Sequence, residues 1–318
     1  MISLCFLLFF APQTGLLRVE GTADAMGTGF TIVAYGEDRG RLQSAVAQGL
    51  EEARRLDAML SNYKPDSEWS EINREAAQHP VHISKEMYEL LAACLEYSRA
   101  SEGSFDITVG KLMKVWGFYK GSGHLPHRAE IWGALNSVGY KYLILSPDGP
   151  DRWVRFERPI EIDPGGIGKG YAVDRIAQIL KDIGIQHALI SGGGSSIYAI
   201  GAPPGEKGWK VDIKDPKDPS KSVETVYLKD ESMSTSGAYE KFFLAEGKLY
   251  SHIMDPRTGY PAQRMLSVSV IAPRTLDSEA WCKPYYILGA QWATRHKNKD
   301  FRVFVCESRP GAQCEWLP

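Results

Sequence analysis

The sequence predicts an α+β fold, in which mixed sheets are flanked by helices. Apolar residues recur at helical spacing in several long segments: residues 41–60, 85–100, 170–183 and 278–288. Short strand-like runs stand between them, and these strands and helices do not alternate strictly. A doubly wound parallel sheet requires such alternation, so an α+β arrangement is favoured.

The first half of the chain begins with a strand-like run, FTIVAY, at residues 30–35. In the helical segment 41–60, Leu42, Val46, Leu56 and Leu60 face one side, with charged residues between them. Pro65 interrupts residues 62–68, which we expect to form a loop. Further along, Ser84 suits the N-cap of the helix at 85–100, and a short helix is expected at 127–138.

The second half contains most of the expected strands. A Pro-Asp-Gly turn at residues 147–149 predicts a hairpin between strands at 140–145 and 153–156. After the helix at 170–183, further strands separated by Gly and Pro are expected at 188–190, 197–200, 209–213, 223–228, 267–272 and 302–306. The helix at 278–288 lies between the last two.

Composition and charge narrow the class of protein. Of the 318 residues, 43% are hydrophobic and 24% are charged, which is typical of a soluble globular protein. The net charge is -2, so no global basic field would attract nucleic acid, and we expect no nucleic-acid partner.

The N-terminus reads MISLCFLLFFA, an apolar run of the length found in signal peptides. It lacks the usual basic segment, and a buried first strand is the alternative. We interpret residues 1–20 as a signal-like or anchor segment and 21–318 as a single domain. This predicts an exported protein, periplasmic or membrane-associated through its N-terminus.

None of the five cysteines forms a CxxC pair, which argues against a zinc site. Cys94 falls on the apolar face of a predicted helix, where a buried small side chain is expected. Cys306 and Cys314 could close a small loop in an oxidising compartment.

Two glycine-rich strings could bring backbone amides close to a ligand. Residues 163–170 read DPGGIGKG and stand directly before a helix, whose N-terminus offers free N–H groups to an anion, with Lys169 beside it. A tight turn from strand to helix is the alternative. Residues 191–196 read SGGGSS, which marks either a backbone pressed against a neighbour or a flexible loop.

Two other strings carry polar and aromatic groups. Residues 250–259 read YSHIMDPRTG, in which His252 could act in acid–base chemistry or could be structural. The GSFDIT string at 103–108 precedes Trp116, Gly117 and Phe118, and the aromatics of this region form either a slot for a planar ring or part of the core.

Taken together and in order, these strings resemble those of the FAD:protein FMN transferase family. The resemblance runs from about Met26 to Gly289 and rests on many separate motifs: Met26-Gly-Thr28, Ser61-Asn-Tyr63, Ser67-Glu68 and Asn73, residues 103–110, 116–118, 162–174, 192–201, 235–239 and 251–259. It implies an α+β fold with an FAD cleft between two lobes. It makes residues 21–318 a catalytic domain.

Members of this family cleave FAD at its pyrophosphate, transfer FMN to a threonine of an acceptor redox protein and release AMP. The resemblance therefore implies FAD as a substrate and such an acceptor as the partner. It places contacts with FAD at Met26, Tyr63, Ser104, Phe105, Asp106, Asp163, Lys169, His252 and Ile253. It also implies that Tyr63 lies near the flavin ring and that His252, Asp163 and Lys283 serve catalysis.

The sequence departs from the family at its Mg²⁺ site. The family holds the cation with an Asp and a Thr four residues apart on a late helix, together with a backbone carbonyl, here that of Gly166. The helix positions are Glu279 and Lys283 in this chain. Three interpretations stay open: the Lys283 ammonium replaces part of the cation, held by Glu279; the pair is a plain salt bridge after loss of the metal and of activity; or a displaced metal binds Glu279, Asp277 and the Gly166 carbonyl.

Two alternative functions follow from the same residues. Water in place of the threonine hydroxyl would make the protein an FAD pyrophosphatase that yields FMN and AMP. The departure at Lys283 also permits a flavin-binding protein without turnover.

Overall fold

The computed structural model describes residues 15–318 except residues 122, 148 and 310. Its helices are α1 (Arg39–Leu60), α2 (Glu68–Glu75), α3 (Lys85–Ala100), α4 (Gly110–Val115), α5 (Arg128–Leu135), α6 (Gly168–Asp182), α7 (Thr275–Leu288) and α8 (Ala290–His296), with short 3₁₀ turns η1 (Phe118–Lys120) and η2 (Tyr140–Tyr142). Its strands are β1 (Leu17–Ala25), β2 (Thr28–Gly36), β3 (Val81–His82), β4 (Leu143–Leu145), β5 (Trp153–Phe156), β6 (His187–Gly192), β7 (Ser196–Ile200), β8 (Trp209–Lys214), β9 (Ser222–Leu228), β10 (Glu231–Gly237), β11 (Phe242–Ala245), β12 (Lys248–Ser251), β13 (Met265–Ala272), β14 (Arg302–Glu307) and β15 (Glu315–Trp316).

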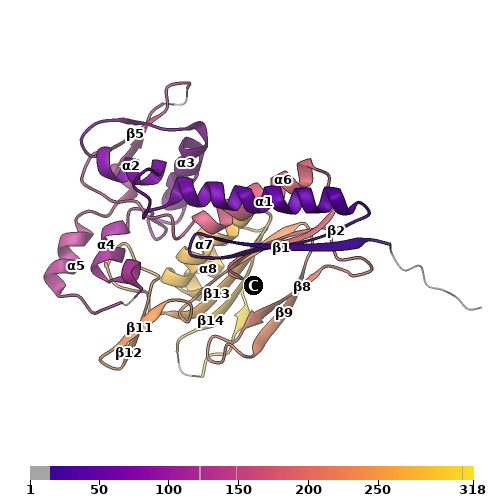
Figure 1. The fold of residues 1–318 in the computed structure, drawn as a ribbon. Coiled ribbons are helices and arrows are strands. Elements are labelled where there is room, and N and C mark those ends of the chain that lie inside the picture. Colours follow the sequence, from indigo (N-terminus) through magenta and orange to yellow (C-terminus); the bar gives the residue numbers. More distant parts are fainter. Residues whose placement is uncertain (1–14, 122, 148, 310) are drawn as a thin grey trace, which may run out of the picture.

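An eight-stranded sheet forms the body of the molecule, in the order β1-β2-β6-β7-β10-β13-β14-β15 (Figure 1). Its neighbouring strands pair antiparallel. The predicted α+β class is therefore confirmed.

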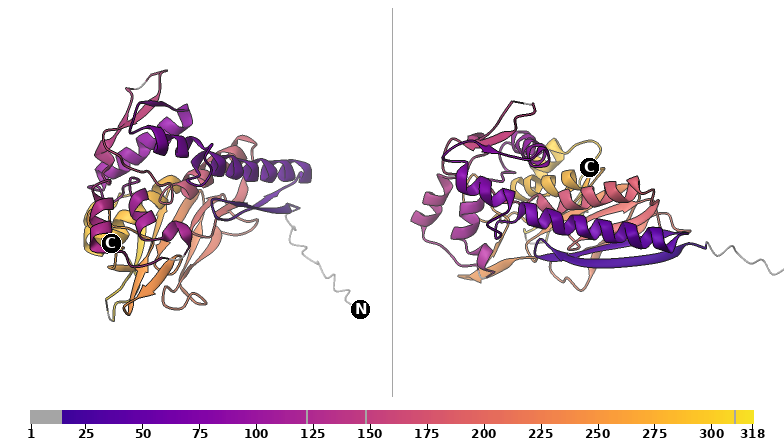
Figure 2. Two further views of the ribbon diagram at one scale, coloured as in Figure 1. Left: turned by 60° about the vertical axis from the view of Figure 1, so that its left-hand side comes forward. Right: turned by 45° about the horizontal axis from the view of Figure 1, so that its top comes forward.

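Three helices, α1, α6 and α7, pack against this sheet and against one another (Figure 2). The apolar faces of α1 and α6 meet the inward side chains of β2, β6 and β7, among them the fully buried Phe30 and Ile32 of β2, whereas α7 packs on β10 and β13. Each such side chain contributes roughly 1.5–3 kcal/mol by its burial. Helix α6 thereby becomes a rigid support for the glycine-rich segment that precedes it.

A smaller lobe stands beside the body, around the three-stranded sheet β3-β5-β4 and helices α2 and α3 (Figure 1). Its core contains the fully buried Trp69, Ile72 and Met87. Two hairpins, β8–β9 and β11–β12, complete the fold as separate two-stranded sheets.

Most of the predicted elements are present, with shifted ends. The segment 140–142 differs: it forms the turn η2, and the strand β4 begins only at Leu143. The helix α2 begins at Glu68, where the predicted loop ends, because Ser67 caps the amide of Ser70. The sequence prediction missed the helices α2, α4 and α8, the strands β1, β3, β10 and β15, and the hairpin β11–β12.

The predicted pairing of Cys306 with Cys314 is confirmed by a disulfide between β14 and the C-terminal segment. Cys94 is a buried free thiol, as expected. Residues 1–14 of the predicted leader lie outside the described residues, and Leu17–Glu20 belong to β1.

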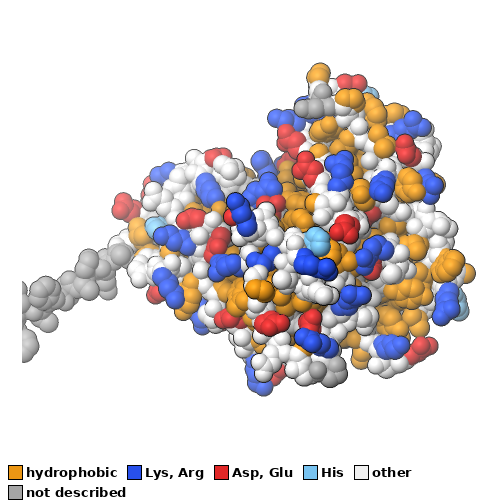
Figure 3. Space-filling model, turned by 180° about the vertical axis from the view of Figure 1, so that it is seen from behind, with side chains coloured by type: hydrophobic (Ala, Val, Ile, Leu, Met, Phe, Trp, Pro, Cys, Tyr) orange, Lys and Arg blue, Asp and Glu red, His pale blue; other side chains and the backbone are white. Residues whose placement is uncertain are grey.

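Within the described ranges, no helix combines the length and apolar character needed to span a membrane. Acidic and basic side chains are interspersed over the face shown in Figure 3, in keeping with the small net charge.

Candidate active site

The glycine-rich segment 163–168 leads directly into α6. At Gly170, in the first turn, this helix packs closely against α7. A Cβ on Gly170 would lie 2.7 Å from the carbonyl oxygen of Thr275 and 2.8 Å from Oε2 of Glu279. Only glycine permits this close approach. The amide of Gly170 donates a hydrogen bond to Oε2 of Glu279, so the start of α6 is tied to α7.

Two cavities meet at this segment. The narrow one, of about 90 Å³, lies between the segments around Phe105, Ile253 and Lys283. The wide one, of about 700 Å³, extends over Tyr63, Lys169 and β8. Both cavities are lined by Met113, Asp163, Gly165 and His252. These shared residues mark a junction between two compartments of different size.

The structure brings the predicted ligand contacts together at these cavities. The wide cavity is lined by Met26, Tyr63 and Lys169. The narrow cavity is lined by Ser104, Phe105, Asp106, Ile253, Gly166 and Lys283. Asp163 and His252 line both, whereas Glu279 lines neither.

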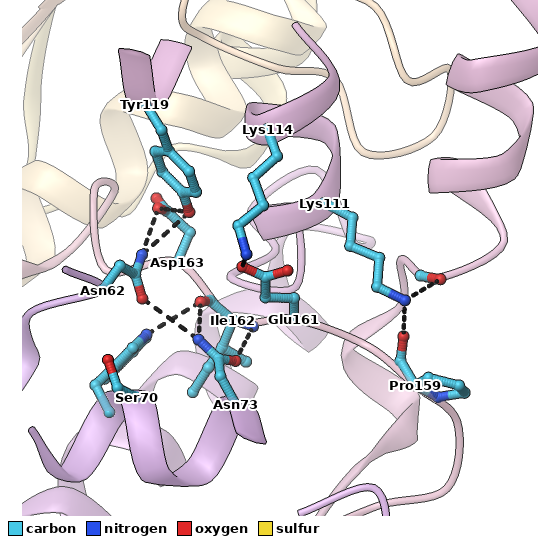
Figure 4. Close-up of polar contacts among 12 residues, drawn as sticks. Asn62, Ser70, Asn73, Lys111, Lys114, Tyr119, Pro159, Glu161, Ile162 and Asp163 are labelled. Atoms are coloured by element: carbon cyan, nitrogen blue, oxygen red, sulfur yellow. Dashed lines mark hydrogen bonds and ion pairs between the residues drawn. The ribbon is translucent and has the colours of Figure 1, made fainter. Parts of the chain in front are cut away.

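Asp163 is held by donors from separate segments (Figure 4). Its Oδ2 accepts hydrogen bonds from the Tyr119 hydroxyl at 2.5 Å and from Nδ2 of Asn62 at 3.0 Å. Its Oδ1 accepts one from the amide of Gly165 at 2.9 Å. Burial raises the pKa of Asp163, and the hydrogen bond from Tyr119 opposes that rise.

The backbone before Asp163 is fixed by α2. Asn73 binds both polar groups of Ile162: its Oδ1 accepts from the amide at 2.7 Å and its Nδ2 donates to the carbonyl at 2.9 Å. The indole of Trp69 donates to the same carbonyl at 3.1 Å. Asp163 therefore projects from a segment that the smaller lobe holds in place (Figure 4).

His252 follows β12 and faces the junction as a neutral imidazole. Its Nδ1 lies 3.2 Å from the carbonyl oxygen of Lys241. A carbonyl only accepts hydrogen bonds, so Nδ1 carries the proton and Nε2 keeps a free lone pair. Burial, and to a lesser extent the nearby charges of Lys169, Lys283 and Lys241, lower the pKa of His252 to about 4.

Two lysines bring positive charge to the cavities. Lys169, in the first turn of α6, donates to the Ser195 hydroxyl at 2.5 Å, next to the glycines of the SGGGSS string. Lys283 projects from α7 into the narrow cavity. Their two ammonium groups make the junction suitable for an anionic group.

Two predicted contact residues also have structural bonds. Asp106 accepts hydrogen bonds from the amide and hydroxyl of Thr108 and from the amide of Tyr140, at 2.7–2.8 Å. The Ser104 hydroxyl donates to the carbonyl of Ser101. Burial raises the pKa of Asp106. These bonds shape the wall of the narrow cavity.

Tyr63 lies at the edge of the wide cavity and is 72% exposed. Its ring meets that of Tyr119 edge to face, with centroids 5.8 Å apart. One face of Tyr63 is therefore available for stacking on a planar ligand.

Sequence reasoning assigned no role to Tyr119, and it included Asn62 and Asn73 in motifs without roles. Tyr119 directly follows Trp116-Gly-Phe118, for which a slot for a planar ring and core packing were both expected, and Trp116 is buried in a hydrophobic core cluster. A hydroxyl at the end of an aromatic run was the available signal. Its partner Asp163 lies 44 residues away in the chain, so the contact itself could not be predicted.

The family model described as "ApbE family" matches residues 26–304. The chain belongs to the ApbE family. The Salmonella typhimurium FAD:protein FMN transferase is 31% identical over 280 residues, covering 84% of this chain and 78% of that protein. The Treponema pallidum FAD:protein FMN transferase is 32% identical, covering 73% and 68%.

Solved ApbE structures share the fold over nearly the whole chain. The ApbE protein of Thermotoga maritima superposes with a TM-score of 0.86 at 30% identity, covering 94% of this chain and 96% of that one. The Pseudomonas stutzeri flavinyl transferase ApbE, in its apo form, gives 0.82 at 27% identity, covering 96% and 95%. The cavities described above therefore lie in an ApbE fold.

The residues of this ApbE chain at the expected metal position do not fit a divalent cation. Nζ of Lys283 lies 3.8 Å from Oε1 of Glu279 and donates to the Glu279 carbonyl at 3.0 Å. The other carboxylate oxygen of Glu279 is bound to the Gly170 amide. Mg²⁺ requires an octahedron of oxygen ligands, and an ammonium beside the site repels it.

The alternative of a displaced metal, bound by Glu279, Asp277 and the Gly166 carbonyl, also lacks free ligands. Asp277 is bound by Arg274 and by the Tyr97 hydroxyl. Lys283 also lies beside Gly166: its Cε is 3.6 Å from the position that a Cβ on Gly166 would take, which is van der Waals contact. Among the residues that the structure describes, no group of three or more His, Cys, Asp or Glu could hold a metal ion.

Proposed function

We propose that this chain transfers FMN from FAD to a threonine of an acceptor protein and releases AMP. The observation that carries the proposal is the junction of two unequal cavities at Asp163, Gly165 and His252. FAD has a planar group at each end and a pyrophosphate between them. A molecule of that shape would place its reacting phosphates at the shared residues. The activity named for the relatives also supports the proposal.

In the proposed reaction, the displacement at phosphorus is in line. The threonine hydroxyl attacks the phosphorus of the FMN half and gives its proton to Nε2 of His252. The bond from that phosphorus to the bridging oxygen breaks, and AMP leaves with the electron pair. Positive charge from Lys169 stabilises the non-bridging oxygens as charge develops on them.

We propose further that the Lys283 ammonium does in this chain what Mg²⁺ does in metal-dependent relatives. The contacts of Lys283 with Glu279 and its place in the narrow cavity support this assignment. A single ammonium is a weaker electrophile than Mg²⁺, so slower turnover is expected.

Turnover of FAD, with Mg²⁺ and with EDTA, tests both proposals. AMP and FMN should form in equal amounts in both conditions, with FMN retained on a threonine-containing acceptor after denaturation. Free FMN in its place would show a pyrophosphatase. AMP only with Mg²⁺ would refute the role of Lys283 and leave the transfer intact.

The double variant Glu279→Asp, Lys283→Thr provides the converse test. It restores the ligand types expected of the metal-dependent relatives, so it should bind Mn²⁺ in electron paramagnetic resonance titrations that the parent protein does not. Binding of Mn²⁺ by the parent would overturn the assignment of Lys283.

We propose that the acceptor is a redox protein and that both proteins work outside the cytoplasm, in the periplasm or at the membrane. The Cys306–Cys314 disulfide supports an oxidising compartment. Labelling of thiols in intact cells tests this, because both cysteines should resist alkylation until a reductant is added. Free thiols at both positions would contradict export.

A further inference from the structure

Tyr119 is placed where it can control Asp163. It lies on the turn η1 between Gly117 and Gly121, whose φ values of +77° and +74° allow the chain to turn sharply on both sides. The turn brings its hydroxyl to Oδ2 of Asp163 and its ring to the edge of Tyr63.

The hydrogen bonds leave the two oxygens of Asp163 unequal. Oδ2 accepts from both Tyr119 and Asn62, which uses both of its lone pairs. Oδ1 accepts only from the Gly165 amide, so one lone pair remains there. Asp163 and Gly165 both line both cavities, so Oδ1 and the amide that it accepts from belong to residues of the junction.

Asn62 is itself held in the orientation that this arrangement needs. Its Nδ2 also approaches the Tyr119 hydroxyl at 3.1 Å, and its Oδ1 accepts from Asn73 at 3.3 Å. The donors on Asp163 thus form one network with the α2 residue that fixes Ile162 (Figure 4).

We infer that Tyr119 is a positioning residue: with Asn62 it occupies Oδ2 of Asp163 and leaves Oδ1 as the oxygen that meets the substrate. The inference rests on the proposed function for the identity of that substrate, FAD. Tyr119 remains a donor at all working pH values, because burial and the charge of Asp163 raise the pKa of its phenol far above the usual range.

Several neighbouring groups shift the pKa of Asp163, and Tyr119 is one of them. Glu161, paired with Lys114, raises the pKa of Asp163, and Lys241 lowers it. The Tyr119 hydroxyl favours the ionised carboxylate. Removing that hydroxyl should therefore raise the pKa of Asp163.

The test is Tyr119→Phe in the full chain, with FAD as the probe. Loss of orientation should lower kcat for AMP release between about tenfold and a hundredfold, with KM for FAD within about threefold of the parent. The acid limb of the pH–rate profile should move to higher pH. The matched control is Tyr171→Phe, which removes a hydroxyl bound to Glu86 at 2.9 Å outside both cavities and should change neither.

An unchanged kcat and acid limb would overturn the inference, and so would a rise in KM alone, which would indicate a direct contact with FAD. Carbon-13 NMR titration of the aspartate carboxyls, with Asp163 assigned by its loss in Asp163→Asn, measures the same shift without turnover. If the parent is inactive but the pKa of Asp163 is still higher in Tyr119→Phe than in the parent, the transferase proposal is refuted and the positioning role is kept. If Tyr119→Phe does not fold, Asn62→Ser removes the other donor and should move both readouts in the same direction.

Discussion

The buried contact between Glu279 and Lys283 should stabilise the fold measurably, and Glu279→Gln tests this. Glutamine keeps the volume and the oxygen that accepts from the Gly170 amide, so the main change is the loss of one negative charge. The Lys283 ammonium then keeps only the backbone carbonyl of Glu279 as a partner, although the Lys283 side chain is only 19% exposed.

The distance sets the size of the effect. At the 3.8 Å between Nζ of Lys283 and Oε1 of Glu279, two unit charges attract by about 4 kcal/mol at an effective dielectric constant of about 20. Partial hydration of the ammonium reduces this, because Lys283 can turn toward the cavity. We expect Glu279→Gln to lower the free energy of unfolding by about 2–3 kcal/mol.

Urea denaturation of a double-mutant cycle measures the contact. Glu279→Gln, Lys283→Met and their combination should give a coupling energy of about 2 kcal/mol. The matched control is Glu51→Gln, which breaks an exposed helical pair with Arg54 and should cost at most about 0.5 kcal/mol. A loss for Glu279→Gln as small as that of the control would refute the view that Glu279 holds Lys283 in place.

The remaining predictions concern other parts of the site and the disulfide. His252→Gln should lower the transfer rate by about 10²–10⁴ while FAD binding, followed by flavin fluorescence, is retained; equal rates would exclude His252 as the base. The pKa of His252 is lowered to about 4 in the fold, so the unfolded chain takes up the proton first as pH falls below 6.5, and stability is lost between pH 6.5 and 4. The parent should therefore lose roughly 1–2 kcal/mol more than His252→Gln between pH 7 and pH 5 in urea denaturation, and identical losses would contradict the half-buried neutral imidazole. Tyr63→Ala should weaken FAD binding by about 1 kcal/mol through loss of stacking, and an unchanged affinity would place the flavin elsewhere. Cys314→Ser opens a loop of 8 residues and should lower the free energy of unfolding by about 2–3 kcal/mol, measured against the parent with and without reductant; an effect of reductant on the variant would point to another cause.

Periodicity and motif order predicted the α+β class, the long helices and most of the residues that are found together at the two cavities. These features depend on local patterns: apolar residues at helical spacing in α1, α3 and α6, and glycines directly before α6. They are therefore readable from a single sequence.

Among the missed elements, the strand β10 depends on contacts across the chain. β10 reads ESMSTSG, a polar run with no strand-like alternation, and it is a central strand because its hydroxyls are satisfied by neighbours. Ser232 and Ser234 bond to the Ser278 hydroxyl of α7. No local pattern predicts such a polar layer between sheet and helix.

The positive charges of three lysines link the binding of FAD to the pKa of His252. Lys169, Lys283 and Lys241 each lower the pKa of His252, so the free site is positive at Nε2. A bound pyrophosphate would bring negative charge to the same junction and offset these three ammonium groups. The pKa of His252 would then rise by the part that the lysines contribute, while burial, the largest cause of the low pKa, would remain. The charges that attract the pyrophosphate therefore add to the effect of burial in the free site, and His252 becomes a better proton acceptor when FAD is in place.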